Sequence, residues 1–317
     1  MNQLATTVSR VPKAAWPFIA FFGLFLVGGL LRPELITIES LLGTAAFAII
    51  LAIASYGQTV AIIQGGIDLS VANTIAFTAL SFLTLTRTIG FLPAALISLL
   101  LGAAIGIING LIITKLSLTP IVTTIAMNGF LFGLILLLFR ASELATIPEG
   151  LETFTSDRIE ILGVSFPAAL LVGLVLMVIL QLLISYTGFG RQLIVTGTSA
   201  EVARYSGIAV DRTKTLGWGL TGLLNAFAAI IIVGFYGQAS PTMGATYLLG
   251  SVAAVVVGGA SIFGGSGSFV ATVGGALVLG QVATLVSVAN LGSNIQQLIY
   301  GLIVLGVVAA YGRNKKG

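Results

Sequence analysis

Cysteine and histidine are both absent from the 317 residues, and charged side chains make up only 8% of the chain. Without cysteine there are no disulfides and no thiolate metal sites. Without histidine the chain lacks the side chain most used for proton relay and metal binding near neutral pH. The formal net charge of +4 is too small to suggest nucleic-acid binding. We therefore expect no metal site and no nucleic-acid partner.

The chain also has too few charged residues to form a polar shell, since 8% compares with about 25% in an ordinary soluble domain. Apolar residues instead reach 57%, glycine adds 40 residues, and the mean hydropathy is +1.12. These values predict an all-α polytopic membrane protein, since the apolar runs lack the alternation of barrel strands. At about 20 residues per crossing, ten transmembrane helices are expected, near residues 15–31, 41–63, 69–86, 92–114, 118–139, 164–186, 216–236, 245–263, 268–289 and 295–311. The first, third and eighth runs are short, which leaves counts of nine or eight open.

Loop charges predict the orientation, because cytoplasmic loops are enriched in lysine and arginine. Basic residues gather at both ends and in segment 187–215: Arg10, Lys13, Arg191, Arg204, Arg212, Lys214, Arg313, Lys315 and Lys316. Acidic residues gather in segment 140–163: Glu143, Glu149, Glu152, Asp157 and Glu160. We expect a cytoplasmic N-terminus (1–14), a transmembrane domain (15–311) with an external loop at 140–163 and a cytoplasmic loop at 187–215, and a cytoplasmic tail (312–317). The first run lacks a small-residue cleavage pattern and is expected to be an uncleaved anchor.

Asp68 is the only acidic residue deep among the apolar runs, and it follows a helix break at Gly65 and Gly66. A carboxylate facing lipid costs a few kcal/mol, so Asp68 is expected to face the protein interior. Two interpretations stand side by side. Asp68 either lines or gates a pathway, or caps the next helix by accepting backbone N–H groups.

A second break, at residues 258–268, contains two Gly-Gly pairs, Gly258–Gly259 and Gly264–Gly265. It lacks the lysine of a phosphate-binding loop, and a tight turn between packed helices is the expected structure. Glycines at four-residue spacing (Gly102, Gly106 and Gly110, then Gly129 and Gly133) predict close helix packing.

Amide side chains lie inside or at the edges of the apolar runs, at Asn73, Asn109 and Asn128 and also at Asn225 and Gln281. Their amides either line a path for a hydroxylated solute or bond neighbouring helices. In the basic loop, residues 198–207 predict a short helix with Ser199 as its N-cap, Glu201 in its first turn and Gly207 as its stop. Such a helix either docks a partner or is a solvated connector.

Four segments, in order and spacing, resemble the ribose/monosaccharide-type permease subunits of bacterial ABC importers. They are GGIDLS (65–70), GIINGLIITKLSLTPIVTTIAM (106–127), GRQLIVTGTSAEVARYSGI (190–208) and VVVGGASIFGGSGS (255–268). The similarity runs from about residue 45 to the C-terminus. One departure is visible: the family usually has valine and glycine after GGIDLS, where this chain has Val71 and Ala72.

The resemblance implies a transport subunit of the bacterial inner membrane that is not an enzyme and binds no cofactor itself. Its implied partners are a second permease subunit, as homodimer or heterodimer, a cytoplasmic ATPase that binds ATP and Mg, and a periplasmic sugar-binding protein. The coupling element would be Gly197, Thr198, Ser199, Ala200, Glu201, Val202, Ala203, Arg204, Tyr205, Ser206 and Gly207, with Glu201 and Arg204 as the first polar contacts to test.

The implied fold is the vitamin-B12-importer-like (type II ABC importer) arrangement. The predicted orientation makes its two related halves inverted repeats, with the Gly-Gly breaks at 65–66 and 258–259 in comparable places. The implied function is import of a monosaccharide by alternating access. The alternatives are a branched-chain amino acid ABC permease and an ion-coupled secondary transporter.

Overall fold

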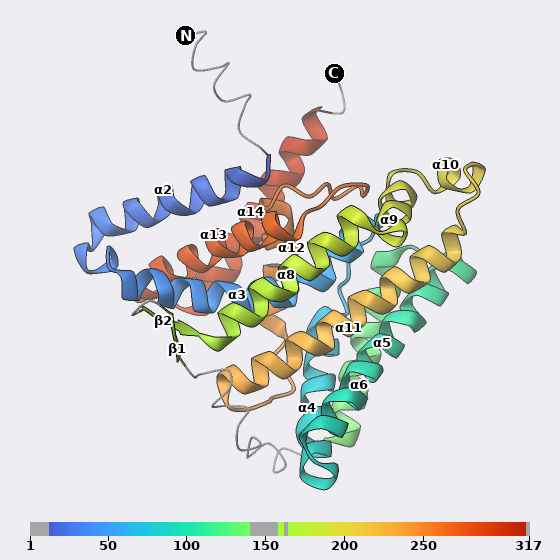
Figure 1. Ribbon diagram of the computed structural model, residues 1–317, viewed down its shortest axis with the longest axis horizontal. Coiled ribbons are helices and arrows are strands. Elements are labelled where there is room, and N and C mark those ends of the chain that lie inside the picture. Colours follow the sequence, from blue (N-terminus) through green and yellow to red (C-terminus); the bar gives the residue numbers. More distant parts are fainter. Residues whose placement is uncertain (1–12, 140–157, 162–163, 315–317) are drawn as a thin grey trace.

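The computed structural model describes residues 13–139, 158–161 and 164–314, and this part of the chain is almost entirely helical (Figure 1). Its α-helices are α2 (Trp16–Leu31), α3 (Ile38–Ile63), α4 (Val71–Ile89), α5 (Phe91–Lys115), α6 (Pro120–Leu138), α8 (Ala168–Tyr186), α9 (Gly188–Thr198), α10 (Ala200–Tyr205), α11 (Val210–Tyr236), α12 (Ala245–Val257), α13 (Phe269–Val288) and α14 (Ser293–Asn314). Short 3-10 turns at Lys13–Ala15 and Pro33–Leu35 flank α2. The all-α class is as predicted.

Each of the ten predicted transmembrane ranges contains one α-helix. Six of these helices, α3, α5, α6, α8, α11 and α13, are long and apolar enough to cross a membrane. The α2 and α12 helices and residues Asn294–Gly306 of α14 are apolar but shorter. The α4 helix carries threonines and Arg87 along its sequence, which lowers its apolar character. The described structure is thus a polytopic membrane protein.

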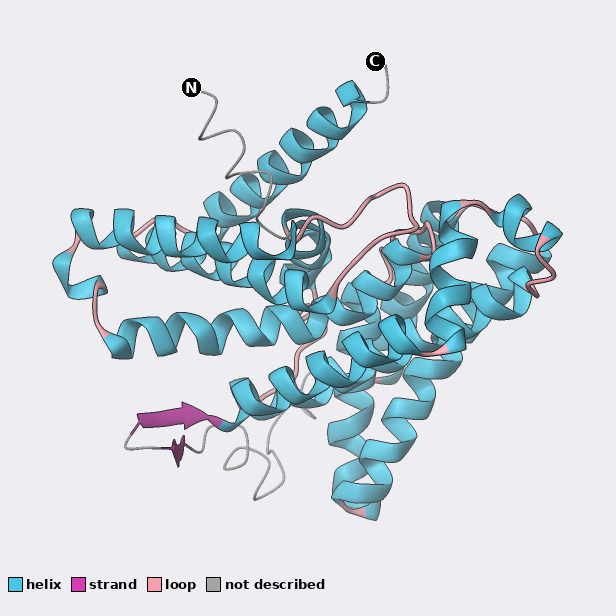
Figure 2. Ribbon diagram, turned by 45° about the horizontal axis from the view of Figure 1, so that its top comes forward, coloured by secondary structure: helices cyan, strands magenta, loops and turns pink. Residues whose placement is uncertain are grey.

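Three segments differ from the prediction. The α12 helix ends at Val257 and not at 263. The chain turns at Gly258 and Gly259, and φ of Gly259 is +86°. Residues 164–167, predicted to be helical, form strand β2 (Val164–Pro167), which pairs antiparallel with β1 (Arg158–Ile161) before α8 begins (Figure 2). The α9 helix was not predicted. The acidic residues expected at 140–157, with residues 1–12 and 315–317, lie outside the described residues.

The α3 helix is the centre of the molecule. It packs against α8, α11, α12 and α13, and nearly all of its second half is buried, from Ala48 to Ile63. Tyr56 donates its hydroxyl to the Gly173 carbonyl oxygen of α8 at 2.9 Å, so even the polar end of this side chain is satisfied inside.

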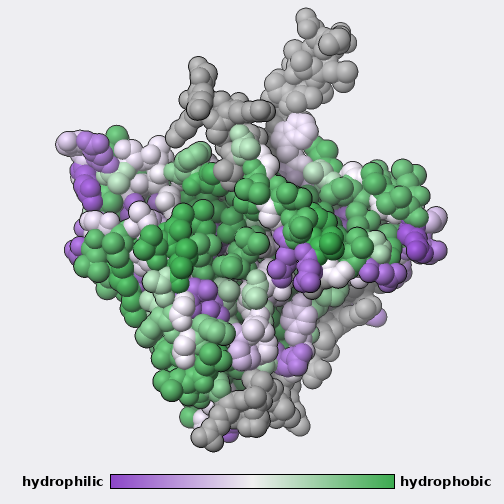
Figure 3. Space-filling view, turned by 180° about the vertical axis from the view of Figure 1, so that it is seen from behind, coloured by the Kyte–Doolittle hydropathy of each residue, from purple (hydrophilic) through white to green (hydrophobic). Residues whose placement is uncertain are grey.

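The outer surface is apolar in turn. Leu30 is 84% exposed and Leu137 is 78% exposed, and hydrophobic side chains cover much of the face in Figure 3. A soluble protein would not expose apolar surface on this scale. In a bilayer the outward side chains meet lipid and not water. The helices therefore need no separate polar face in order to pack stably.

Two groups of three helices pack in the same pattern. One is α4, α5 and α6, which follow α3, and the other is α12, α13 and α14, which follow α11. The α5 helix packs on α11 and α4, and α6 packs on α4. In the same way α13 packs on α3 and α12, and α14 packs on α12. The Gly-Gly breaks do not follow this correspondence, because the break at 65–66 follows α3 while the break at 258–259 follows α12. The expectation that they occupy comparable places is therefore wrong.

Close packing of α5 on α11 depends on glycine. A Cβ atom at Gly106 would overlap the Trp218 backbone oxygen, and one at Gly102 would overlap the Gly222 backbone oxygen. The prediction of close packing is confirmed for this helix. It does not extend to α6 within this chain, since a Cβ atom at Gly129 or Gly133 would meet no described atom within 4 Å.

A matched pair of variants tests this contact. Gly106→Ala should lower the stability of the detergent-solubilised protein by roughly 1–3 kcal/mol, because overpacking forces α5 and α11 apart. Gly129→Ala makes the same chemical change on α6 and should be neutral or slightly stabilising, since alanine favours helix more than glycine. Thermal unfolding of both variants measures the difference. Equal midpoints would contradict the assigned packing.

Candidate functional site

The polar centre of the molecule is the chain break between α3 and α4. Asp68 is 2% exposed, and its Oδ1 accepts hydrogen bonds from the Ser70 backbone N–H at 2.9 Å and from the Ser70 hydroxyl at 2.5 Å. Its Oδ2 accepts from Asn225 Nδ2 of α11 at 2.9 Å. Gln58, with its amide turned to suit its neighbours, bonds the backbone oxygen and N–H of Asp68 at 3.0 and 3.2 Å. Only one of these contacts is to a backbone N–H, that of Ser70, the residue before α4, and the N-cap of α4 has no side-chain cap bond. Asp68 therefore stabilises the turn before α4 and joins it to α11, and it does not cap the first turn of the helix.

The three asparagines proposed as pathway residues gather around the same break. Asn109 Nδ2 donates to the Ser70 hydroxyl at 3.1 Å. Asn73 Nδ2 donates to the Asn128 backbone oxygen at 2.9 Å, and Asn128 Oδ1 accepts the Asn73 backbone N–H at 3.3 Å. The amides thus bond α4 to α5 and α6. Their placement favours the helix-bonding interpretation over pathway lining, although no contact with a solute tests either.

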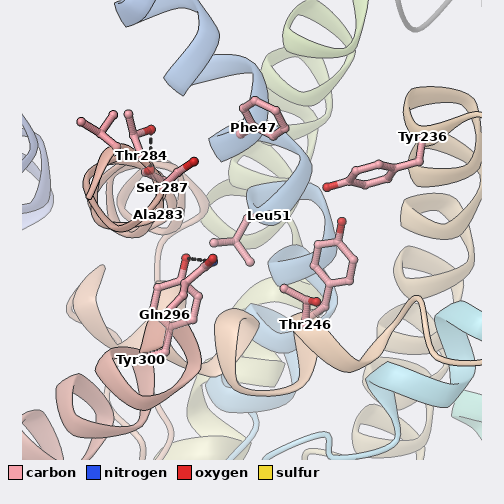
Figure 4. Close-up of a pocket in the computed structure, with 12 residues that line it drawn as sticks. Phe47, Leu51, Tyr236, Thr246, Ala283, Thr284, Ser287, Gln296 and Tyr300 are labelled. Carbon is pink, nitrogen blue, oxygen red and sulfur yellow. Dashed lines mark hydrogen bonds between the residues drawn. The ribbon is translucent and has the colours of Figure 1, made fainter. Parts of the chain in front are cut away.

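A cavity lies elsewhere, among α3, α11, α12, α13 and α14 (Figure 4). Its volume is about 510 Å³, within the range of small-molecule sites. The lining residues are Phe47, Leu51, Tyr236, Thr246, Tyr247, Gly280, Ala283, Thr284, Ser287, Val288, Gln296 and Tyr300. A smaller cavity of about 270 Å³ shares Tyr236, Thr246 and Tyr247 with it and extends to Gln238 and Ser240. None of the four proposed pathway residues lines either cavity.

The lining is neutral and rich in hydroxyl groups. It combines three tyrosines with Thr246, Thr284, Ser287 and Gln296, and it includes no charged side chain. Figure 4 shows the hydroxyls of Tyr236 and Ser287 pointing toward the space between them. At its base Gln296 Nε2 donates to the Tyr300 hydroxyl at 2.8 Å, which in turn donates to the Leu279 carbonyl oxygen at 3.0 Å. Among the described residues no acidic cluster is arranged to hold a metal ion.

Sequence reasoning missed this cavity because its lining comes from five helices and no motif. The available signal was weak. Tyr236 ends α11 and Tyr247 lies in the first turn of α12, and tyrosine is enriched where helices meet the membrane surface. The third tyrosine, Tyr300, lies well inside α14 and gives no such signal. Spacing along the chain could not show that these three meet.

The loop predicted to be cytoplasmic contains α9 and α10, which meet at an angle and are called the elbow here. Ser199 caps α10 as predicted, its hydroxyl accepting the Val202 N–H at 3.3 Å, and Gly207 follows the helix with φ at +78°. Val202 is 57% exposed and Tyr205 is 85% exposed. Arg204, by contrast, pairs with Asp211 of α11 at 3.2 Å. Glu201 is also exposed, and Arg204 stays 62% exposed in its pair with Asp211. The exposed surface of α10 therefore combines charged side chains with Val202 and Tyr205.

The bend between α9 and α10 is held in a junction of glycines, defined here as Gly65, Gly197, Gly264 and Gly265. A Cβ atom at Gly197 would overlap the Ile63 carbonyl oxygen, and one at Gly264 would lie 2.5 Å from the Gly197 carbonyl oxygen. The Gly265 N–H donates to the Ile63 carbonyl oxygen at 2.8 Å. Gly65, Gly264 and Gly265 all have positive φ values, +84°, +92° and +77°, which favour glycine. The glycine junction thus joins α9, the end of α3 and the α12–α13 turn.

An exchange of partners tests whether Asp68 acts as a structural acceptor. Asp68→Asn should destabilise the protein by about 1–3 kcal/mol, because an amide nitrogen would face the Asn225 donor. The double variant Asp68→Asn with Asn225→Asp restores one donor and one acceptor across the same gap. Thermal unfolding should show at least partial recovery in the double variant. Additive losses would instead indicate that the carboxylate is needed at position 68 for another reason.

Comparison with known proteins supplies the context for this geometry. Residues 40–308 match the family described as "Branched-chain amino acid transport system / permease component". The autoinducer 2 import system permease protein LsrD of Photorhabdus laumondii is 33% identical over 293 residues, covering 91% of this chain and 87% of the relative. LsrD of Salmonella typhimurium is 34% identical over 287 residues, with 89% and 86% covered. LsrD of Escherichia coli O9:H4 is 32% identical, with 88% and 86% covered.

No solved structure matches the chain. The relatives are transport permeases and not enzymes. The family match covers most of the chain, the curated relatives are similar over nearly their full length, and six helices are suited to crossing a membrane. The chain belongs to the family of branched-chain amino acid transport system permease components and is a multi-pass inner-membrane permease of the monosaccharide-type ABC importers.

Proposed function

We propose that this chain imports a monosaccharide by alternating access, paired with a second permease chain and driven by a separate cytoplasmic ATPase. A periplasmic binding protein would deliver the sugar, and ATP and Mg²⁺ would be bound by the ATPase and not by this chain. The observation that carries the proposal is the α9–α10 elbow, which presents exposed side chains on α10 and is held to the core at the bend between the two helices.

The elbow has the properties needed to transmit force. Tyr205 and Val202 project from α10 into open space, and buried tyrosines commonly dominate the binding energy of protein interfaces. Arg204 already has a partner in Asp211. Both polar contacts expected from sequence remain accessible, because Glu201 is exposed and Arg204 is 62% exposed beside Asp211. Tyr205 adds an exposed aromatic ring to them.

Matching neighbours in the two helix groups support an inverted-repeat, vitamin-B12-importer-like fold. The α4–α5–α6 set on α11 mirrors the α12–α13–α14 set on α3. In an arrangement of this kind ten helices cross the membrane, and both chain ends lie on the cytoplasmic side with α10. The start of α2 and the end of α14 point to the same side of the molecule in Figures 1 and 2, which is consistent with that orientation.

The substrate class follows from charge. The cavity of about 510 Å³ includes no charged side chain in its lining, which suits a neutral sugar better than a zwitterionic amino acid. An ion-coupled mechanism would need a carboxylate available to a coupling ion. The Asp68 oxygens are already bonded to Ser70 and Asn225, which counts against this alternative.

Reconstitution of the full complex tests the function. Proteoliposomes holding the permease chains and ATPase, with binding protein outside, should accumulate a radiolabelled sugar only when ATP is enclosed. Ionophores that collapse proton and sodium gradients should leave uptake unchanged. Uptake that needs no ATP and stops with the ionophores would reject the proposal in favour of a secondary transporter.

Tyr205→Ala should weaken retention of the ATPase by about tenfold, as expected when an aromatic anchor is lost from an interface. Tyr186→Ala is the matched control, because Tyr186 is also strongly exposed and ends α8 beside the elbow. Co-purification of the ATPase with each tagged variant measures the difference. Equal retention would place the contact away from α10.

Gly197→Ala should uncouple the ATPase from transport. A methyl group at 197 must push the elbow away from Ile63. A mutation of this kind changes the coupling free energy by roughly 0.5–2 kcal/mol, which corresponds to a loss of about 2- to 30-fold in transport. ATPase retention should persist, because α10 is unchanged. Gly188→Ala, at an open position at the start of α9, is the control. Normal transport by Gly197→Ala would exclude a coupling role for the glycine junction.

A further inference from the structure

We infer that the cavity among α3, α11, α12, α13 and α14 is a binding site for a neutral, polyhydroxylated solute, with Tyr236, Tyr247, Ser287 and Gln296 as its recognition groups. The inference rests on the proposed function and assigns its substrate site to residues that no sequence motif contains.

The chemistry of the lining carries the first step. A polyol in an apolar surrounding needs hydrogen-bond partners for each hydroxyl group. The cavity supplies tyrosine, threonine and serine hydroxyls and one amide, together with aromatic and aliphatic surface from Phe47 and Leu51. A phosphorylated or carboxylated ligand would need a cation, and the lining has none. Neutral groups that can both donate and accept match the hydroxyls of a sugar.

Position in the fold carries the second step. The α11 helix begins beside the elbow and ends at Tyr236, so the cavity lies at the end of the molecule away from α10. The start of α12, the end of α13 and the start of α14 reach the same place. If the elbow faces the ATPase, the cavity faces the side from which a binding protein releases its sugar.

The third step links the cavity to the glycine junction. Phe47 and Leu51 line the cavity from α3, and Ile63 at the C-terminal end of the same helix lies in the glycine junction. At a rise of 1.5 Å per residue, the segment from Phe47 to Leu51 and Ile63 are separated by roughly 20 Å along the helix. The α13 helix makes the same connection, since it begins after the 258–268 turn and ends at Ser287 and Val288 in the cavity wall. Movement of the elbow therefore displaces two walls of the cavity together.

The absence of cysteine from the chain allows a clean test. Ser287→Cys places one thiol in the cavity wall with almost no change in size. Thr242→Cys places one on the neighbouring loop, at an exposed residue outside both cavities. The reconstituted complex is treated from outside with a membrane-impermeant thiol reagent, with and without the sugar it transports among D-ribose, D-xylose and D-galactose. Ribose 5-phosphate and leucine serve as charged probes.

The sugar should slow labelling of Ser287→Cys by about tenfold at ten times its dissociation constant, and the charged probes should not. Labelling of Thr242→Cys should not respond to any probe. A bulky label at position 287 should abolish uptake, while one at 242 should not. Tyr247→Phe should raise the sugar concentration needed for protection, with Tyr186→Phe as the matched control.

The result that overturns the inference is ATP-dependent uptake that survives the bulky label at 287, with labelling insensitive to the transported sugar. That outcome leaves the proposed importer intact and moves its sugar site elsewhere. Protection by leucine in place of sugars would overturn the neutral-polyol assignment. Loss of ATP dependence, by contrast, would reject the proposed function itself.

Discussion

A chain that reverses inside a membrane protein must satisfy its own backbone and polar groups, and this requirement at residues 64–70 determines much of the surrounding structure. Asp68 binds Ser70 and Asn225, Gln58 binds the backbone of Asp68, and Asn109 extends the network to α5. Each contact comes from a different helix. The break that ends α3 is therefore the place where α4, α5 and α11 are fixed to it.

Glycine has two distinct roles around this centre. Along α5 and α11 it allows two backbones to approach closely enough for a carbonyl oxygen to lie where a Cβ atom would otherwise be. In the glycine junction it supplies positive φ values as well as space, at Gly65, Gly264 and Gly265. The first role stabilises the helix packing. The second ties a surface loop to the end of the most buried helix.

The middle and the C-terminal end of α3 consequently belong to two different surfaces. Ile63, at the end, meets the elbow through the glycine junction, while Phe47 and Leu51, near the middle, meet the neutral cavity. A rigid, buried helix transmits displacement along its axis better than an exposed one, because packed interiors resist deformation. In the proposed importer, coupling between the two faces would depend on this backbone geometry and not on ion pairs.

Much of this protein was determined by the sequence alone. Ten apolar runs correspond to ten helices, Ser199 caps α10, and Asp68 lies buried beside a helix break, because hydropathy and capping act over a few residues. The family resemblance also rested on local segments. Only the tertiary structure decided that α12 ends early, that Arg204 pairs with Asp211, and that Asn73, Asn109 and Asn128 bond helices. The cavity and the glycine junction likewise join residues more than a hundred positions apart. Their formation depends on which helix faces meet, and in a membrane protein whose helices are apolar on every side, no sequence period specifies those faces.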